Sequence, residues 1–526
     1  MRLDWLRIPS YGNLQNFEID FDEEQPTAVI IGRNGSGKSN LIEAIVEIFR
    51  ELAIGRAPSF AYMLRYVYRE KIIELDADPE RTSRRLKISV DKKSLSQKDF
   101  KASIDDYLPS YVFAYYSGWS SRLEKHFDKP TRDYYLRILD SKGSEMPLRR
   151  LFFCRKEYSQ LVLLAFFLSE STSALKLLED YLNIKCFSSA LFVLKTPWWR
   201  GSGAPKKIQR DEGDPRFWYA RGAFKTFLDT LWNGALAPIR NTESIERDVR
   251  RQGEKVERLY LFIKNQVELA RLKKEQEDPK TLFGYLESLF LCDLMDEVRV
   301  TVERSDGTQV KFTQLSEGEQ QLLTVLGLLL FTQNDESLYL LDEPDTHLNP
   351  VWTYDFLKLL QDNIRAEKGQ LLIATHNPLM IGTLHKNQVR ILRQQEQATM
   401  AEEPEYDPIG IGIEGLLKSE LYGLRSTLAP EILEKLDEHY RLLGTQEKTP
   451  EEELKLIKLA NELNSLHVSR THPNPYFEQF ANAMARTIPE QDVLTKEEIE
   501  DQARLADEVL AEILVEEDAL EEGKQN

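Results

Sequence analysis

The segment Gly32–Ser39, which reads Gly-Arg-Asn-Gly-Ser-Gly-Lys-Ser, constrains the fold of this chain more than any other feature. It follows the short apolar run Ala28–Ile31, and apolar residues then recur at helical spacing over Asn40–Ala53. This order predicts a buried strand, a glycine-rich turn and a helix. The pattern GxxxxGK[ST] turns successive backbone N–H groups toward phosphate oxygens, and the positive end of the helix faces the same oxygens. A glycine-rich turn without a ligand is the alternative, and the complete strand–turn–helix context disfavours it.

The pattern assigns a task to the last two residues of this turn, Lys38 and Ser39. We expect Lys38 to reach the β- and γ-phosphates of a nucleotide and Ser39 to bind Mg²⁺. The residues predicted to bind the nucleotide are Gly32, Arg33, Asn34, Gly35, Ser36, Gly37, Lys38, Ser39 and Asn40.

A second apolar strand, predicted over Ser337–Leu341, ends in the carboxylates Asp342 and Glu343. Many strands end in carboxylates at a turn, so this pattern alone is weak. Beside a phosphate-binding loop it predicts that Asp342 holds Mg²⁺ and that Glu343 polarises the attacking water of phosphoryl transfer.

Two further motifs surround this strand. Ser316 and Gly318 precede the apolar helix predicted over Leu322–Phe331, and a helix N-terminus is an anion site. The alternative is an ordinary capping box between Ser316 and Glu319. Later, an apolar strand ends at His376, which could contact a γ-phosphate, although a lone histidine is more often structural.

The four segments, in this order, resemble the ATP-binding-cassette (ABC) ATPases. The resemblance implies an α/β head, with a mixed sheet and flanking helices, that binds ATP and Mg²⁺. It makes Lys38, Glu343 and His376 catalytic, with His376 as the switch histidine. In this family the signature motif, here Leu-Ser-Glu-Gly-Glu-Gln over residues 315–320, closes on the ATP of another subunit. We therefore expect Ser316 and Gly318 to act in a head-to-tail dimer or a higher even-numbered oligomer.

Finer features narrow the resemblance to the SMC, RecF and OLD branch. They are the variant signature and the tail Leu348-Asn349-Pro350. The segments 115–118, 151–160 and 412–424 look like the PtuA ATPases of Septu and retron-associated antiphage systems. That resemblance implies a separate HNH-type nuclease as partner, and allows a nucleic acid or a retron reverse transcriptase with its DNA. It also suggests that Gln160 senses Mg²⁺; the alternative is a surface residue at the start of a helix.

The long gap between Lys38 and Ser316 predicts an inserted subdomain. It lacks sustained heptads, so we expect a compact helical insertion instead of a coiled-coil rod. The predicted division is an N-terminal head part at 1–147, a mostly helical insertion at 148–290, a C-terminal head part at 291–395, and an acidic helical region at 396–526 that could dock a partner. Within the insertion, 242–277 is predicted as a long exposed helix. Leu505, Val509, Leu510, Ile513 and Leu514 form an apolar stripe near the C-terminus.

Charge, cysteine content and hydrophobicity limit nucleic-acid binding, cellular location and membrane association. The net charge of −18 disfavours nucleic-acid binding through the overall field, so such binding needs a local basic patch. One candidate is the loop with Trp198, Trp199, Lys206, Lys207 and Arg210, for which a partly buried loop is the favoured alternative. Three separated cysteines and the lack of a long apolar run predict a cytoplasmic protein without a membrane partner.

The sequence also lacks a motif for nucleic-acid cleavage. No Toprim or HNH pattern is visible, so nuclease activity is expected in a partner only. The alternatives to a defence ATPase are a RecF- or SMC-like DNA-repair ATPase that binds DNA directly and, less favoured, a transporter ATPase subunit.

Overall fold

The computed structural model describes residues 1–118, 120–140, 148–168, 172–200, 207–245, 254–273, 279–333, 335–364, 368–395, 398–445, 448–466 and 504. The chain divides into two compact units. The first contains Met1–Thr383 and Asn387–Glu403, and the second contains Leu384–Lys386 and Pro404–Asn526.

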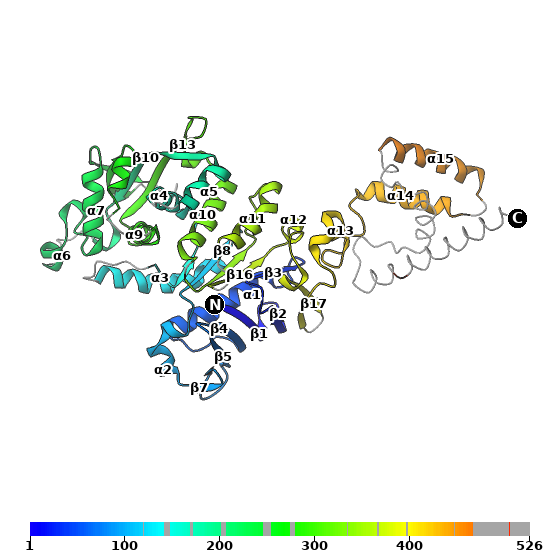
Figure 1. Cartoon of the computed structure of the whole chain (residues 1–526), viewed down its shortest axis with the longest axis horizontal. Helices are drawn as coiled ribbons and strands as arrows, with labels where there is room; N and C mark the ends of the chain where they lie inside the picture. Colours follow the sequence, from blue (N-terminus) through cyan, green and yellow to red (C-terminus); the bar gives the residue numbers. More distant parts are fainter. Residues whose placement is uncertain are drawn as a thin grey trace. The chain divides into compact units, whose positions relative to one another are not determined.

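A sheet of 13 strands forms the centre of the first unit (Figure 1). In sheet order the strands are β7 (Lys93–Leu95), β6 (Leu86–Val90), β5 (Lys71–Ala77), β4 (Tyr62–Tyr68), β1 (Arg2–Tyr11), β2 (Leu14–Asp20), β18 (Ala398–Glu402), β17 (Val389–Gln395), β3 (Thr27–Gly32), β16 (Gly369–Ala374), β15 (Ser337–Asp342), β8 (Tyr111–Tyr116) and β9 (Leu151–Phe153). From β7 to β2 neighbouring strands are antiparallel, whereas β17, β3, β16, β15, β8 and β9 run parallel.

Burial follows this change of strand direction. Every residue of β15 and β16 is buried, as expected for parallel strands covered on both faces. In β4, buried Leu64 and Tyr66 alternate with exposed Met63 and Arg65, because one face of the antiparallel part meets solvent. The strands predicted from the apolar runs at 28–31 and 337–341, and the strand predicted before His376, are confirmed as β3, β15 and β16.

The helices of the first unit are α1 (Lys38–Ile54), α2 (Gln97–Ala102), α3 (Arg122–Asp140), α4 (Tyr158–Leu168), α5 (Thr172–Leu182), α6 (Lys207–Glu212), α7 (Ala223–Gly234), α8 (Gln266–Ala270), α9 (Pro279–Leu291), α10 (Glu317–Thr332), α11 (Pro350–Asp362) and α12 (Pro378–Ile381). Helix α1 packs against β3, β8, β15 and β16, so the parallel strands and the phosphate-loop helix share one core. Short 3-10 turns lie at Ile104–Asp106, Trp198–Arg200, Pro215–Phe217 and Phe312–Gln314.

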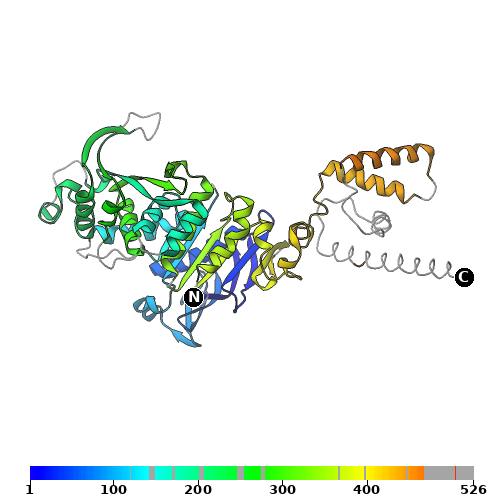
Figure 2. The ribbon, with the colours of Figure 1, turned by 45° about the horizontal axis from the view of Figure 1, so that its top comes forward.

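A second, five-stranded antiparallel sheet lies in the first unit. In sheet order its strands are β11 (Ile239–Ile245), β12 (Glu254–Ile263), β10 (Ile184–Lys195), β13 (Met295–Arg304) and β14 (Gln309–Lys311). Figures 1 and 2 show it with α4, α7 and α9 at one end of the unit. Strands β13 and β14 form a hairpin whose turn contains Ser305, Asp306 and Gly307.

The helix predicted over 242–277 is wrong for most of its described residues. Its N-terminal end lies in β11 and its middle in β12, and only the short helix α8 follows. In β12 the residues Val256, Leu259, Leu261 and Ile263 are buried. The last three recur at every second position, which is the period of a half-buried strand, and the charges between them mask that period.

The second unit contains the 3-10 turn Pro408–Gly410 and the helices α13 (Gly412–Lys418), α14 (Pro430–Leu443) and α15 (Pro450–Ser465). Helices α14 and α15 pack against each other. The described residues of the region after 395, up to 466, are therefore helical as predicted, except that β18 pairs with β17 and belongs to the first unit. The apolar stripe at 505–514 lies outside the described residues. No helix in the described part of the chain is long and apolar enough to span a bilayer.

Candidate nucleotide site

The loop between β3 and α1 has a backbone that only glycine allows at two positions. A Cβ on Gly32 would lie 2.7 Å from the backbone oxygen of Leu392. Gly37 has φ 108°, and a Cβ there would lie 2.5 Å from the Leu14 side chain. Gly37 is also the N-cap of α1 and offers no side-chain cap, so the first N–H groups of this helix remain available to an anion.

Lys38, the first residue of α1, is held inside this loop. Its ammonium donates to the carbonyl oxygen of Gly32 at 2.8 Å. Burial lowers the pKa of Lys38, and the nearby carboxylates of Glu343 and Asp342 oppose that shift. The ammonium is therefore positioned before any ligand binds.

Asp342, at the end of β15, provides the buried carboxylate of the site. Burial raises its pKa to about 6, while a hydrogen bond with Ser39 acts in the opposite direction. Its Oδ1 atom is buried and has no hydrogen-bond partner among the described residues. An unsatisfied carboxylate oxygen beside a hydroxyl is the oxygen-rich environment that Mg²⁺ prefers, so these residues fit the predicted cation.

Glu343 has a left-handed backbone conformation, with φ 52°. Its amide donates to the carbonyl of Ala374 at 2.8 Å, and its carbonyl accepts from the Thr346 hydroxyl at 2.9 Å. Its carboxylate Oε2 lies 2.7 Å from Nδ1 of His376. A non-glycine residue in this region costs free energy and persists where surrounding contacts hold it, as at many functional sites.

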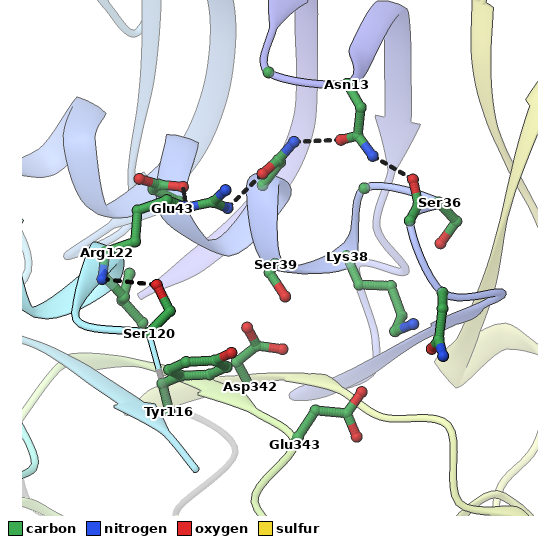
Figure 3. Close-up of a pocket in the computed structure, with 16 residues that line it drawn as sticks. Asn13, Ser36, Lys38, Ser39, Glu43, Tyr116, Ser120, Arg122, Asp342 and Glu343 are labelled. Carbon is green, nitrogen blue, oxygen red and sulfur yellow. Dashed lines mark hydrogen bonds and ion pairs between the residues drawn. The ribbon is translucent and has the colours of Figure 1, made fainter. Parts of the chain in front are cut away.

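Lys38, Asp342 and Glu343 face one cavity of about 660 Å³, shown in Figure 3. His376 does not line this cavity and reaches it only through its contact with Glu343. Of the predicted nucleotide-binding residues of the loop, 34–40 line it together with Asp342 and Glu343, whereas Gly32 and Arg33 do not. The Gly32 carbonyl instead accepts a hydrogen bond from Lys38. The complete lining is Gly12, Asn13, Asn34, Gly35, Ser36, Gly37, Lys38, Ser39, Asn40, Glu43, Tyr116, Ser120, Arg122, Leu123, Asp342 and Glu343.

Sequence reasoning missed the side chains that reach the cavity from the β1–β2 turn and from the end of β8. They include Asn13, Tyr116, Ser120 and Arg122. The strand ending in Tyr116 was visible as an apolar run before a turn. Nothing local indicated that β8 lies parallel beside β15 and therefore ends at the same edge of the sheet.

The signature residues lie outside this cavity of their own chain. Ser316 caps α10: its hydroxyl accepts from the Glu319 amide at 3.2 Å, and the Glu319 carboxylate accepts from the Ser316 amide at 2.6 Å. The capping box considered from the sequence is therefore present. A Cβ on Gly318 would lie 2.5 Å from the carbonyl oxygen of His347, so glycine permits close packing of α10 against the loop after β15.

The structure does not bring Gln160 to the cavity, so the prediction that it binds the cation is not supported by its position. Gln160 lies in α4, and its Oε1 accepts from the Val300 amide at 3.2 Å. The chain leaves the cavity edge after β8 and passes through α3 and β9 before it reaches α4.

The tryptophan loop is partly anchored. The Trp199 indole donates to the carbonyl of Cys292 at 2.8 Å, and the Trp198 amide donates to Asp293 at 3.0 Å. Trp199 is thus partly buried, as in the alternative, whereas Trp198 is 68% exposed. Residue 206, like the arginines between 247 and 251, lies outside the described residues.

The fold and this cavity define a P-loop ATPase head. Residues 28–382 match the family described as "AAA domain, putative AbiEii toxin, Type IV TA system", and the chain belongs to that family.

Individual proteins give partial matches. The chain resembles the Septu protein PtuA of Bacillus mycoides, with 26% identity over 37% of this chain and 28% of PtuA. It also resembles the Retron Vc95 probable ATPase of Vibrio cholerae, with 24% identity over 20% of this chain and 22% of that protein. The chain thus spans less than a third of either relative. The SMC head domain of Thermotoga maritima aligns over 77% of this chain and 100% of its own, with 14% identity and a TM-score of 0.32.

Proposed function

We propose that the chain hydrolyses Mg-ATP at sites shared between two copies, and that its nucleotide state controls an HNH-type nuclease in antiphage defence. One observation carries the hydrolytic part. Lys38, Ser39, Asp342 and Glu343 converge on one cavity, with Glu343 held in a strained backbone beside His376.

Each of these residues has a distinct task in the proposed reaction. The backbone amides of the loop and Lys38 bind the phosphates, and Ser39 and Asp342 hold Mg²⁺, which neutralises phosphate charge. Glu343 accepts a hydrogen bond from the attacking water and orients it toward the γ-phosphorus. His376, with Nδ1 2.7 Å from Oε2 of Glu343, positions that carboxylate.

A second copy completes the site in this proposal. Ser316 is exposed at the start of α10 and lies outside the cavity of its own chain, so it can face the ATP of a partner, while the buried Gly318 follows it in the sequence. A head-to-tail dimer, or a higher even-numbered assembly, would then contain two equivalent sites. Because Gly318 packs on the carbonyl of His347, the signature of each chain is joined to the loop that follows its own Glu343.

The Glu343→Gln variant tests the hydrolytic proposal. It should bind ATP as the wild type does, hydrolyse it about 10²- to 10⁴-fold more slowly, and accumulate as an ATP-bound dimer. Steady-state ATPase rates and light scattering with and without ATP measure both effects. Glu297→Gln, on a half-exposed strand of the second sheet, is the matched control and should change neither. A Glu343→Gln rate equal to the wild-type rate would show that another residue orients the water.

The resemblance to PtuA and to the retron ATPase supports the defence part of the proposal. We propose the division predicted from the sequence with two changes: the insertion at 148–290 contains β10, β11 and β12 of the second sheet beside its helices, and β9 and β18 belong to the head. The remainder of 396–526 is proposed as the region that docks the nuclease subunit. Co-expression with the product of a neighbouring gene, followed by mass measurement of the purified complex, tests this. Purification of the chain alone, with no nuclease gene beside its own, contradicts the defence assignment.

One observation favours a second candidate, an ATPase that binds DNA directly. Between Arg56 and Lys101 the chain has twelve Lys and Arg against seven Asp and Glu, within a protein of net charge −18. This segment includes β4 to β7 and α2. The candidate predicts ATPase stimulation by DNA that falls steeply with salt. A rate that responds to neither DNA nor salt rejects it.

A further inference from the structure

Arg122, the first residue of α3, lies in the nucleotide cavity although no motif includes it. Lys38 and Arg122 are the cationic side chains among the described residues that line this cavity. The same lining carries three carboxylates, on Glu43, Asp342 and Glu343. A nucleotide is strongly anionic, so a cationic side chain that lines the cavity favours its binding.

Two side chains of α1 hold the guanidinium of Arg122. Its Nη2 donates to Oδ1 of Asn40 at 2.5 Å, and its Nε lies 2.6 Å from Oε2 of Glu43. Glu43 has a second partner, because its Oε1 lies 2.8 Å from Nε2 of His126. Glu43 therefore keeps a hydrogen bond when Arg122 turns toward a ligand, so this exchange does not leave a buried carboxylate without a partner.

The contact of Arg122 with Asn40 extends to the phosphate loop itself. The Asn40 amide donates to the Asn13 side chain, and Asn13 donates to the backbone oxygen of Gly35. Dashed lines in Figure 3 mark these hydrogen bonds. The position of Arg122 is thus fixed relative to the loop by a chain of hydrogen bonds.

The location of Arg122 along the cavity indicates which phosphate it meets. Figure 3 shows Lys38 and Arg122 on opposite sides of Ser39. Lys38 and Glu343 mark the end where the γ-phosphate reacts. Asn40, which follows the phosphate loop along α1, marks the other end, where the α-phosphate joins the nucleoside.

We propose that Arg122 is a nucleotide-binding residue that contacts the α-phosphate end, and that it exchanges Glu43 for phosphate oxygens when the nucleotide enters. The planar guanidinium can donate two parallel N–H bonds to a phosphate, which a lysine cannot. Because ADP and ATP share this end, Arg122 contributes equally to the binding of both. This inference rests on the proposed function, since it requires a nucleotide in the cavity.

Calorimetric titration of the full chain with Mg-ATP and with Mg-ADP tests the proposal. Hydrogen bonds to charged groups contribute enough that Arg122→Ala should weaken the binding of both nucleotides by a similar factor, about ten- to a hundredfold. Arg122→Lys, which keeps the charge without the paired donors, should recover part of this loss. Lys125→Ala removes an exposed cation of the same helix that does not line the cavity, and should change neither affinity.

Several outcomes separate the failures. Wild-type ADP affinity in Arg122→Ala overturns the inference, and so does a loss confined to ATP, which would place Arg122 at the γ-phosphate. Equal losses in Arg122→Ala and Lys125→Ala would indicate a general charge effect and also overturn it. Absence of nucleotide binding by the wild type and by Lys125→Ala would instead reject the proposed function. A thermal midpoint for each variant confirms that it is folded.

Discussion

Arg149 and Glu287 form a buried ion pair that joins the segment before β9 to α9. Their side chains are 5% and 0% exposed. Nε of Arg149 donates to Oε1 of Glu287 at 3.0 Å, and the Tyr158 hydroxyl donates to the same oxygen at 3.2 Å. The guanidinium also donates to the Thr131 hydroxyl in α3. Removal of one charge therefore leaves the other buried and uncompensated.

We expect Arg149→Met to destabilise the first unit by about 3 to 5 kcal/mol, the usual cost of removing one partner of a buried pair. For a unit of this size that corresponds to a fall in thermal midpoint of about 6 to 10 °C, at about 2 °C per kcal/mol. The double variant Arg149→Met, Glu287→Leu should regain most of the loss, because an apolar pair replaces the ion pair.

Calorimetry of the full chain measures these midpoints, and amide exchange in α9 locates the effect. The matched control is Arg299→Met, which breaks a pair 57% and 39% exposed and should cost less than about 1 kcal/mol. If Arg149→Met shifts the midpoint no more than Arg299→Met does, the reasoning about uncompensated burial is wrong for this pair.

Two further predictions concern α10 and the second unit. Gly318→Ala should lower the ATPase rate while each chain still binds Mg-ATP, because the new Cβ would lie 2.5 Å from the His347 carbonyl oxygen. Calorimetric titration and steady-state rates check the two parts, and a wild-type rate would contradict the prediction. Hydrogen bonds from Arg441 and Lys455 lower the pKa of Glu438 from 4.5 to about 2. Its stabilisation of the α14–α15 pair is therefore complete above pH 4.5 and is lost as the pH falls from about 4.5 to 2. Amide protection in α14 should follow that course in the wild type and be flatter in Glu438→Gln, and identical profiles would contradict it.

The nucleotide loop and the strand ending in Asp342 could be predicted because each is encoded within a few consecutive residues. Apolar runs mark the two strands, and the glycines with Lys38 mark the turn. Their convergence could also be expected, since parallel strands end at the same edge of a sheet. The structure agrees, with β15 and β3 both paired to β16.

Side chains that enter the site from other parts of the fold could not be predicted in this way. Asn13 and Arg122 reach the cavity because the β1–β2 turn and the start of α3 pack beside α1. Those positions depend on tertiary contacts without a local pattern. Gln160 is the opposite case. The resemblance of segment 151–160 suggested that it senses Mg²⁺, but it lies in α4 and accepts from the Val300 amide, away from the cavity.

The hairpin of β11 and β12 was missed for a different reason. Charged residues such as Glu257 and Arg258 interrupt the apolar ones and resemble an exposed helix. They are instead paired across the sheet, as in the contact of Arg258 with Glu243 at 3.0 Å. Cross-strand pairs of this kind become visible only once the partner strand is known.

Complementation between two inactive variants tests the shared ATP site most directly. Lys38→Ala removes the phosphate-binding lysine, and Ser316→Arg blocks the signature, so each variant alone should be inactive. In a mixed dimer, the intact loop of one chain meets the intact signature of the other. An equal mixture should therefore recover about a quarter of the wild-type ATPase rate, since half of the dimers are mixed and each has one intact site. A mixture as inactive as its components, or a Ser316→Arg variant that hydrolyses ATP alone at the wild-type rate, would contradict a site shared between two copies.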